Sequence, residues 1–126
     1  MKPQRTTAEH FQLFQAEFRR WVEIFGLKQW ELYFQHKLDK ENRATIYWNI
    51  PDYIATITLS TVWYDFEQPI TEEEIRQCAF HETCEMLLAP LNACAQRRFL
   101  DEHEIQGESH VLIRKLENVL FPKYRE

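Results

Sequence analysis

The sequence has few cysteines, no surplus of basic residues and no long apolar run, and each shortage excludes a class of protein. Its three cysteines, Cys78, Cys84 and Cys94, are odd in number and have no CxxC spacing. This argues against a disulfide framework and favours a reducing compartment. The formal net charge is -5, whereas binding nucleic acid requires an excess of Lys and Arg on one face. No nucleic-acid partner is therefore expected.

Targeting and membrane segments are also missing from the pattern of the sequence. No stretch has the roughly 18 consecutive apolar residues needed to cross a bilayer, and the polar N-terminal residues lack the apolar region of a signal peptide. We therefore expect a soluble, cytoplasmic protein that does not bind membranes. The 126 residues, of which 44% are hydrophobic, suffice for one core and predict a single domain over residues 1–126.

The spacing of hydrophobic residues predicts an α+β fold with the order helix, three strands, helix, helix. A capping box of Thr6 and Glu9 is expected to begin the first helix, and Gly26 to end it. Alternating patterns then predict three short strands, and Pro51 and Asp52 supply a turn that makes the last two an antiparallel hairpin. The strands are expected at residues 30–36, 44–50 and 55–60.

Two C-terminal helices complete the expected fold. A second capping box, of Thr71 and Glu74, begins the first of them, whose pattern ends at Leu88 ahead of Pro90. The second is expected over residues 102–120. Its apolar face is predicted to contain Ile105, Leu112, Leu116 and Val119.

The first C-terminal helix contains the pattern His-Glu-x-x-Glu, formed by His81, Glu82 and Glu85. Residues four apart face the same way on a helix, so His81 and Glu85 can both reach one ion while Glu82 lies at its flank. Zinc accepts imidazole nitrogens and carboxylate oxygens as ligands. The pattern is therefore that of a His-Glu-x-x-His zincin motif in which Glu85 replaces the second histidine.

Glu82 shares a helix stripe with apolar residues, which predicts that its carboxylate lies against the core. Burying an unpaired carboxylate is costly, and a cation is one way of offsetting that cost. An alternative interpretation needs no metal: Glu82 and Glu85 are then solvated helix residues, and His81 is a core histidine. The apolar residues of the stripe are Ile75, Ala79 and Met86.

A third metal ligand is expected from the last helix, because catalytic zinc commonly has three protein ligands and one water. At about 3.6 residues per turn, Glu108 lies at the edge of the apolar face, whereas His110 points away from it. Glu108 is therefore the predicted third ligand, although a surface carboxylate near a helix N-terminus would also fit this position. The cysteines are expected to be structural, since Cys84 lies on the opposite side of its helix from His81.

These two helices resemble a known family. A helix with Ala-Phe-His-Glu-x-x-Glu-x-Leu-Leu-Ala-Pro-Leu, followed by one with Glu-Ser-His-Val-Leu-Ile-Arg-Lys-Leu-Glu, is similar to the small phage-associated metallopeptidases of the gluzincin type, which include minigluzincin and SprT-like domains. The resemblance covers about residues 30–120. It implies zinc or another divalent metal held by His81, Glu85 and Glu108, with Glu82 as general base. It also implies a peptide or protein substrate along an edge strand beside the metal.

Two functions follow as hypotheses from this resemblance. The first is a zinc-dependent metallopeptidase, in which Glu82 takes a proton from a metal-activated water and passes it to the leaving amine. The second is a zincin-like domain without catalysis that acts as a structural or interaction module in a phage or prophage. Glu85 favours the second, because a more anionic ligand set makes the metal a weaker Lewis acid. An α+β binding domain without metal remains a third hypothesis.

Overall fold

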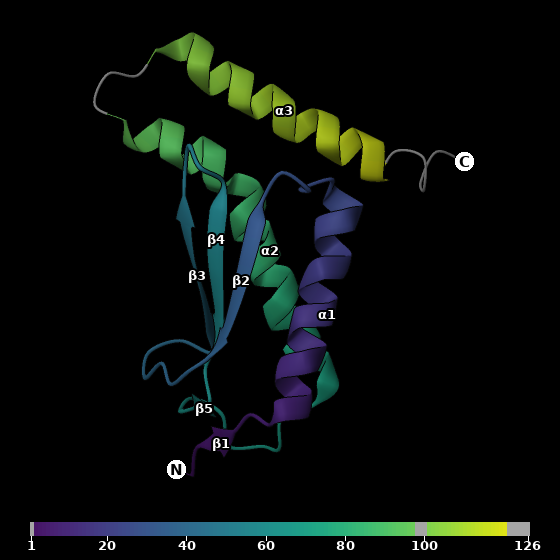
Figure 1. Ribbon diagram of the computed structural model, residues 1–126, viewed down its shortest axis with the longest axis vertical. Coiled ribbons are helices and arrows are strands. Elements are labelled where there is room, and N and C mark those ends of the chain that lie inside the picture. The colour runs from purple at the N-terminus through teal and green to yellow at the C-terminus, as the bar shows by residue number, and fades with distance from the viewer. Residues whose placement is uncertain (1, 98–100, 121–126) are drawn as a thin grey trace.

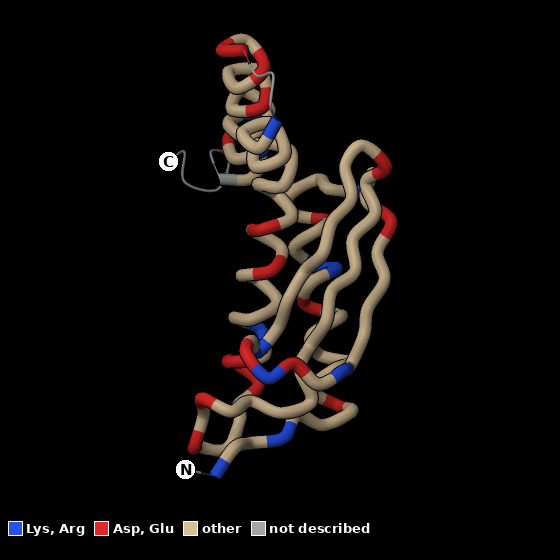
Figure 2. The backbone as a smooth tube through the Cα atoms, turned by 90° about the vertical axis from the view of Figure 1, so that its left-hand side faces the viewer, with Lys and Arg blue, Asp and Glu red and all other residues tan. Residues whose placement is uncertain are grey.

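The computed structural model describes residues 2–97 and 101–120. The predicted α+β fold and its order of elements are confirmed, and the structure adds two short strands that the sequence pattern did not predict. Figure 2 shows the sheet and the helices as two layers, and Figure 1 shows α3 lying across one end of the helical layer, where it contacts α2 and α1. The elements are β1 (Gln4–Arg5), α1 (Ala8–Phe25), β2 (Glu31–His36), β3 (Ala44–Asn49), β4 (Ile54–Leu59), β5 (Val62–Trp63), α2 (Glu72–Gln96) and α3 (Glu102–Leu120).

The first helix begins one residue later than expected. Thr7 is its N-cap, since the Thr7 side chain accepts a hydrogen bond from the His10 backbone N–H at 3.1 Å and His10 Nδ1 accepts one from the Thr7 N–H at 3.0 Å. The predicted capping box of Thr6 and Glu9 is therefore wrong. The physical reason is that the Thr6 hydroxyl donates instead to the Ser60 carbonyl oxygen at 2.7 Å, which ties the start of α1 to the end of β4.

The three-stranded sheet has the order β2-β4-β3. Strands β3 and β4 are antiparallel, as the predicted hairpin requires, whereas β2 and β4 are parallel. In this register Ile57 of the central strand lies between Phe34 and Ile46. Strand β3 is thus an edge strand, and it contacts α2 directly. The topology therefore places one free strand edge beside the helix that contains the His-Glu-x-x-Glu pattern.

The core lies between the sheet and the two helices α1 and α2. Ile57 and Leu59 of β4 are fully buried, and Phe14 and Phe18 of α1 are equally inaccessible. Burial of side chains of this size stabilises each by about 2 kcal/mol relative to exposure. The contribution of α2 to the same core is a row of buried residues, Ile75, Ala79, Met86, Leu87 and Ala89.

Helix α2 is longer than predicted. Its capping box is confirmed, because Thr71 Oγ1 accepts from the Glu74 N–H at 3.3 Å and Glu74 Oε2 accepts from the Thr71 N–H at 3.1 Å. The predicted end at Leu88 is wrong, since the helix continues through Pro90 to Gln96. Proline inside a helix costs about 3 kcal/mol and bends it, and Figure 1 shows that α2 changes direction in its second half. Buried side chains around the proline offset this cost, namely Leu87, Ala89 and Cys94.

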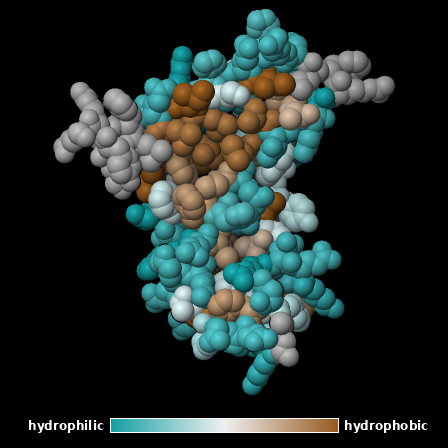
Figure 3. Space-filling model, turned by 180° about the vertical axis from the view of Figure 1, so that it is seen from behind, coloured by the Kyte–Doolittle hydropathy of each residue, from teal (hydrophilic) through white to brown (hydrophobic). Residues whose placement is uncertain are grey.

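Helix α3 has the predicted bounds but turns a narrower face inward. Leu112 and Val119 pack against the core, as predicted. Ile105 and Leu116 are 37% and 39% exposed, so the expected apolar face is only partly buried, because α3 has a neighbour on one side only. Figure 3 shows apolar side chains gathered on the helical face turned away from the sheet. In the described part of the chain, none of the helices is both long and apolar enough to cross a membrane.

Candidate metal centre

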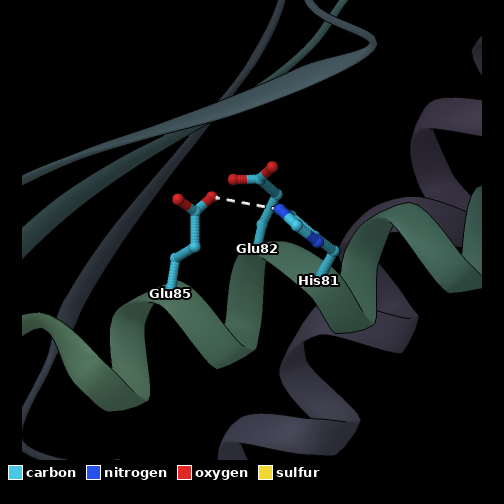
Figure 4. A group of neighbouring side chains, drawn as sticks. All are labelled: His81, Glu82 and Glu85. Carbon is cyan, nitrogen blue, oxygen red and sulfur yellow. Dashed lines mark ion pairs between the residues drawn. The ribbon is translucent and has the colours of Figure 1, made fainter.

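His81, Glu82 and Glu85 form one compact cluster on α2. One potential ligand atom from each residue lies within 4.8 Å of the other two, and His81 Nε2 is 3.7 Å from Glu85 Oε2. Figure 4 shows the three heads rising from the same helix and turned toward one another, beneath the strands. The spacing of four residues between His81 and Glu85 produces this arrangement, because one helical turn brings the two side chains together.

The three residues differ sharply in burial. The side chains of His81 and Glu85 are 72% and 51% exposed, whereas Glu82 is only 4% exposed. The neighbours of Glu82 on its helix stripe, Ala79 and Met86, are fully buried. The carboxylate of Glu82 therefore lies against the core, as its position in the apolar stripe predicted, and the cluster has one buried and two accessible members.

Glu82 lacks the hydrogen bonds that a buried carboxylate normally has. Its Oε2 atom is buried and has no partner among the described residues. Burial against the core, together with the nearby carboxylate of Glu85, raises the pKa of Glu82 from its ordinary value of 4.5 to about 9. Without a cation, Glu82 therefore keeps its proton at neutral pH. A cation beside it would favour the charged form and lower its pKa.

The donor set fits a divalent cation. One imidazole nitrogen and carboxylate oxygens are ligands that zinc, and harder divalent metals, accept. The unpartnered Oε2 atom of Glu82 is what such an ion would pair with, since buried polar atoms without partners are uncommon in folded proteins. His81 and Glu85 offer the two accessible ligands, and Glu82 lies beside them either as a third ligand or as a base.

The cluster opens onto a cleft of about 390 Å³ between α2, the segment before β3 and the segment after β5. His81 and Glu82 form part of its wall. The sequence did not indicate that the remaining lining residues share a site with the cluster, because they come from three segments that only the fold brings together. They are Glu41, Asn42, Arg43, Ala44, Asp65, Glu74, Gln77 and Cys78.

Arg43 and Asp65 form an ion pair in the wall of this cleft. Arg43 Nε lies 3.1 Å from each Asp65 carboxylate oxygen, and Arg43 Nη2 lies 3.0 Å from Oδ2. Proximity to Asp65 raises the pKa of Arg43, so its positive charge is permanent. No sequence signal pointed to this pair, since the two residues are separated by a hairpin and belong to no motif.

Glu108, the predicted third ligand, lies elsewhere. It lines a separate cavity of about 480 Å³ together with Pro90 and Cys94. At about 1.5 Å per residue, these two positions lie about 14 Å and about 20 Å beyond His81 along α2. The cluster that could hold a metal contains no residue of α3 among the described residues. The expectation that Glu108 joins it is therefore corrected: α3 meets α2 near its proline, past the His-Glu-x-x-Glu segment.

The cysteines do not add ligands to the cluster. The cluster of ligand-type groups contains no cysteine among the described residues, and burial raises the pKa of the Cys78 thiol in the cleft wall to about 11, which favours its neutral form in the metal-free protein. Cys94 is 2% exposed and belongs to the second half of α2. Both observations agree with the structural role expected from the sequence.

Comparison with known proteins gives no match to a family model, a curated sequence or a solved structure. The resemblance to gluzincin-type peptidases therefore rests on the motifs of α2 and α3 alone. Function has to be argued from the cluster on α2 and the cleft beside it.

Proposed function

We propose that the protein is a metal-dependent peptidase that binds zinc, or a divalent metal of similar preference, through His81 and Glu85 beside Glu82. One observation carries this proposal: Glu82 is 4% exposed, and its unpartnered oxygen lies within a cluster of ligand-type groups that opens onto a cleft. A buried carboxylate with only a structural role is expected to accept N–H or O–H donors. A cation, and a water beside it, supply the missing partners.

Each residue of the cluster has a distinct task in this proposal. A bound zinc ion supplies Lewis acidity, which lowers the pKa of a water and polarises a carbonyl group. His81 and Glu85 hold the ion at the mouth of the cleft. Glu82 accepts the proton of the attacking water on its carboxylate and donates it to the leaving nitrogen. The packing of Glu82 against the core fixes the carboxylate in position for both proton transfers.

The free edge of β3 supports a peptide as substrate. Among the described residues, β3 pairs only with β4, and it contacts α2. An extended peptide that adds to this edge would form backbone hydrogen bonds with β3 and pass beside the cleft. The fold therefore favours an extended polypeptide over a compact small molecule as the substrate of the α2 cluster.

The substitution Glu82→Gln tests the proposal directly. If Glu82 is the general base, purified Glu82→Gln protein retains stoichiometric zinc by elemental analysis, while hydrolysis of a quenched-fluorescence peptide library falls by roughly 10² to 10⁴-fold. Glu73→Gln, an exposed glutamate in the first turn of the same helix, is the matched control and is expected to change neither quantity. Undiminished turnover in Glu82→Gln would exclude Glu82 from the reaction.

A second function is a zincin-like structural or interaction module without catalysis. The position of Glu108 in a separate cavity favours it, because the cation is then left with Glu82 itself as its third ligand and no base remains in the cluster. In that case Glu82→Gln loses zinc, and the unmodified protein cleaves no member of the peptide library. The same two measurements therefore separate the peptidase from the module.

A further inference from the structure

The guanidinium of Arg43 is held rigidly in the wall of the cleft. Asp65 binds one of its edges, with distances of 3.1 Å and 3.0 Å from Nε and Nη2. Its Cζ atom lies 5.0 Å from the ring centroid of Trp63 and 5.1 Å from that of Phe66. Trp63 is 1% exposed, so the surface under the guanidinium is part of the core. A side chain that ordinarily has high rotamer entropy is thus already ordered.

The opposite end of the same guanidinium has no partner. Among the described residues, Nη1 of Arg43 makes no hydrogen bond or ion pair, and the side chain is 37% exposed. Arg43 lines the cleft that His81 and Glu82 also line. It is the one Lys or Arg in that lining within the part of the chain that the structure describes. Arg43 therefore shares the wall of this cleft with two members of the candidate metal centre, and it keeps N–H donors at Nη1 without an acceptor among the described residues.

Charge decides which acceptor fits these donors. Asp65 already neutralises Arg43, and Glu41 and Glu74 add further negative charge to the wall of the cleft. A second carboxylate would be repelled by these three acids, whereas a neutral carbonyl oxygen would accept the free N–H groups without that penalty. A peptide supplies such carbonyl oxygens at every residue.

We infer that Arg43 is a substrate-positioning residue, whose free end donates hydrogen bonds to a backbone carbonyl oxygen of a peptide lying in the cleft. The inference rests on the proposed function insofar as the cleft must take a peptide. It adds the group that holds the peptide in register with Glu82. The Asp65 pair and the aromatic rings maintain the geometry, which a lysine could not reproduce because it lacks the planar fork.

Arg43→Gln and Arg43→Lys test this role, with Arg97→Gln as the matched control. Arg97 also forms an ion pair, with Glu104 at 2.9 Å, but it lines the other cavity. Zinc affinity is measured by competition with a chromogenic chelator, and KM and kcat with the quenched-fluorescence peptide library. Binding is measured separately by fluorescence polarisation of the same peptides, without quencher, on zinc-loaded Glu82→Gln protein carrying each Arg variant.

Arg43→Gln is expected to weaken peptide binding and raise KM by roughly tenfold to a hundredfold, the range for a lost hydrogen bond from a charged donor. Zinc affinity is expected to be unchanged. Arg43→Lys, which keeps the charge and the packing of the aliphatic chain, is expected to fall between Arg43→Gln and the unmodified protein, and it decides the question if Arg43→Gln does not fold. Arg97→Gln is expected to bind peptide normally. Amidated and free-acid peptides are expected to bind equally.

Several results would overturn the inference. Unchanged peptide binding and KM in folded Arg43→Gln and Arg43→Lys would remove Arg43 from substrate binding while leaving the peptidase intact. If the Arg43 variants also lose zinc affinity, the role of Arg43 is structural. If only peptides with a free C-terminal carboxylate bind, the partner of Arg43 is that carboxylate and not a backbone carbonyl oxygen. If the protein binds peptide in an Arg43-dependent manner but cleaves none, catalysis fails and the inference stands. Absence of peptide binding by the unmodified protein overturns it.

Discussion

The position of the Glu82 side chain is determined by apolar packing and not by polar contacts. Its neighbours Ala79 and Met86 are fully buried, and its own Oε2 atom has no partner among the described residues. A carboxyl group in such a place is held still by the core while its buried oxygen lacks the partner that would offset its desolvation. This combination is unfavourable for a metal-free fold and favourable for a site that must position a base or a ligand accurately.

Single substitutions distinguish the roles of Glu85 and Glu108, the two acids predicted from the sequence as metal ligands. Glu85→Ala removes an accessible member of the cluster, and we expect zinc affinity to fall by roughly tenfold or more. Glu108→Ala changes a residue of the other cavity and is expected to leave zinc affinity unchanged. Isothermal titration of the metal-free proteins with zinc measures both. A loss in Glu108→Ala as large as that in Glu85→Ala would place the α3 acid back at the metal.

The local part of this site could be predicted and the long-range part could not. The convergence of His81 and Glu85 follows from helical spacing, and the burial of Glu82 follows from its apolar stripe. Glu108 was assigned to the wrong site because a helical projection shows which residues share a face of α3. It does not show at which point along α2 the two helices meet. Arg43 was missed because its contacts with Asp65 and two aromatic rings exist only after the β3–β4 hairpin has brought residue 43 beside residues 63–66.

At the scale of secondary-structure elements, the helices were easier to predict than the pairing of strands. Helix α3 has the expected bounds and α2 the expected start, since caps and periodicity are local signals. The pairing of strands has no such local signal. Alternation of apolar and polar residues predicts β2, β3 and β4, but it does not predict that β2 pairs in parallel with β4. The end of α2 was wrong because buried side chains around Pro90 outweigh the local cost of the proline.

Replacing each of the two glycines of the chain by alanine is expected to change the free energy of unfolding in opposite directions. Gly26 ends α1 at φ 67, and the following N–H, of Leu27, donates to the Val22 carbonyl oxygen at 2.9 Å. Gly107 lies inside α3, and a Cβ atom built at either position meets nothing within 4 Å. We expect Gly26→Ala to lower the free energy of unfolding by about 1 kcal/mol through backbone strain. Gly107→Ala should raise it by up to about 1 kcal/mol through helix propensity.

Urea denaturation followed by circular dichroism measures both glycine variants against the unmodified protein. The open space around both Cβ positions excludes a steric clash as the explanation, so the sign of the change reports the backbone alone. Equal destabilisation by the two substitutions would contradict the assignment of Gly107 to the interior of a regular helix.

At the scale of the whole molecule, the buried acid makes the stability of the metal-free fold depend on pH. The pKa of Glu82 is raised from 4.5 to about 9, chiefly by burial. Above pH 4.5 the unfolded chain loses this proton while the folded chain retains it. The free energy of unfolding therefore falls as the pH rises from about 4.5 to about 9, with a slope of at most about 1.4 kcal/mol per pH unit.

Comparing the metal-free protein with Glu82→Gln isolates this effect. Between pH 7 and pH 8 the unmodified protein should lose about 1 kcal/mol more stability than Glu82→Gln, because other ionisable groups contribute similarly to both. Urea denaturation at the two pH values, with a chelator present, gives the difference. Added zinc should reduce the slope, since it stabilises the charged carboxylate. Identical slopes in the two metal-free proteins would mean that Glu82 is ionised throughout this range.

Helix α3 rests on the far part of α2 and on the end of α1, where Lys115 Nζ donates to the Gly26 carbonyl oxygen at 3.4 Å. The cluster of His81, Glu82 and Glu85 lies before Pro90 on α2, and the cleft beside it contains no α3 residue among the described residues. Substitutions or insertions in α3 are thus insulated from the chemistry of the cluster. We therefore expect the last helix to tolerate substitution without altering the cluster, whereas a change in the segment before β3 or in the first turns of α2 alters the wall of the cleft.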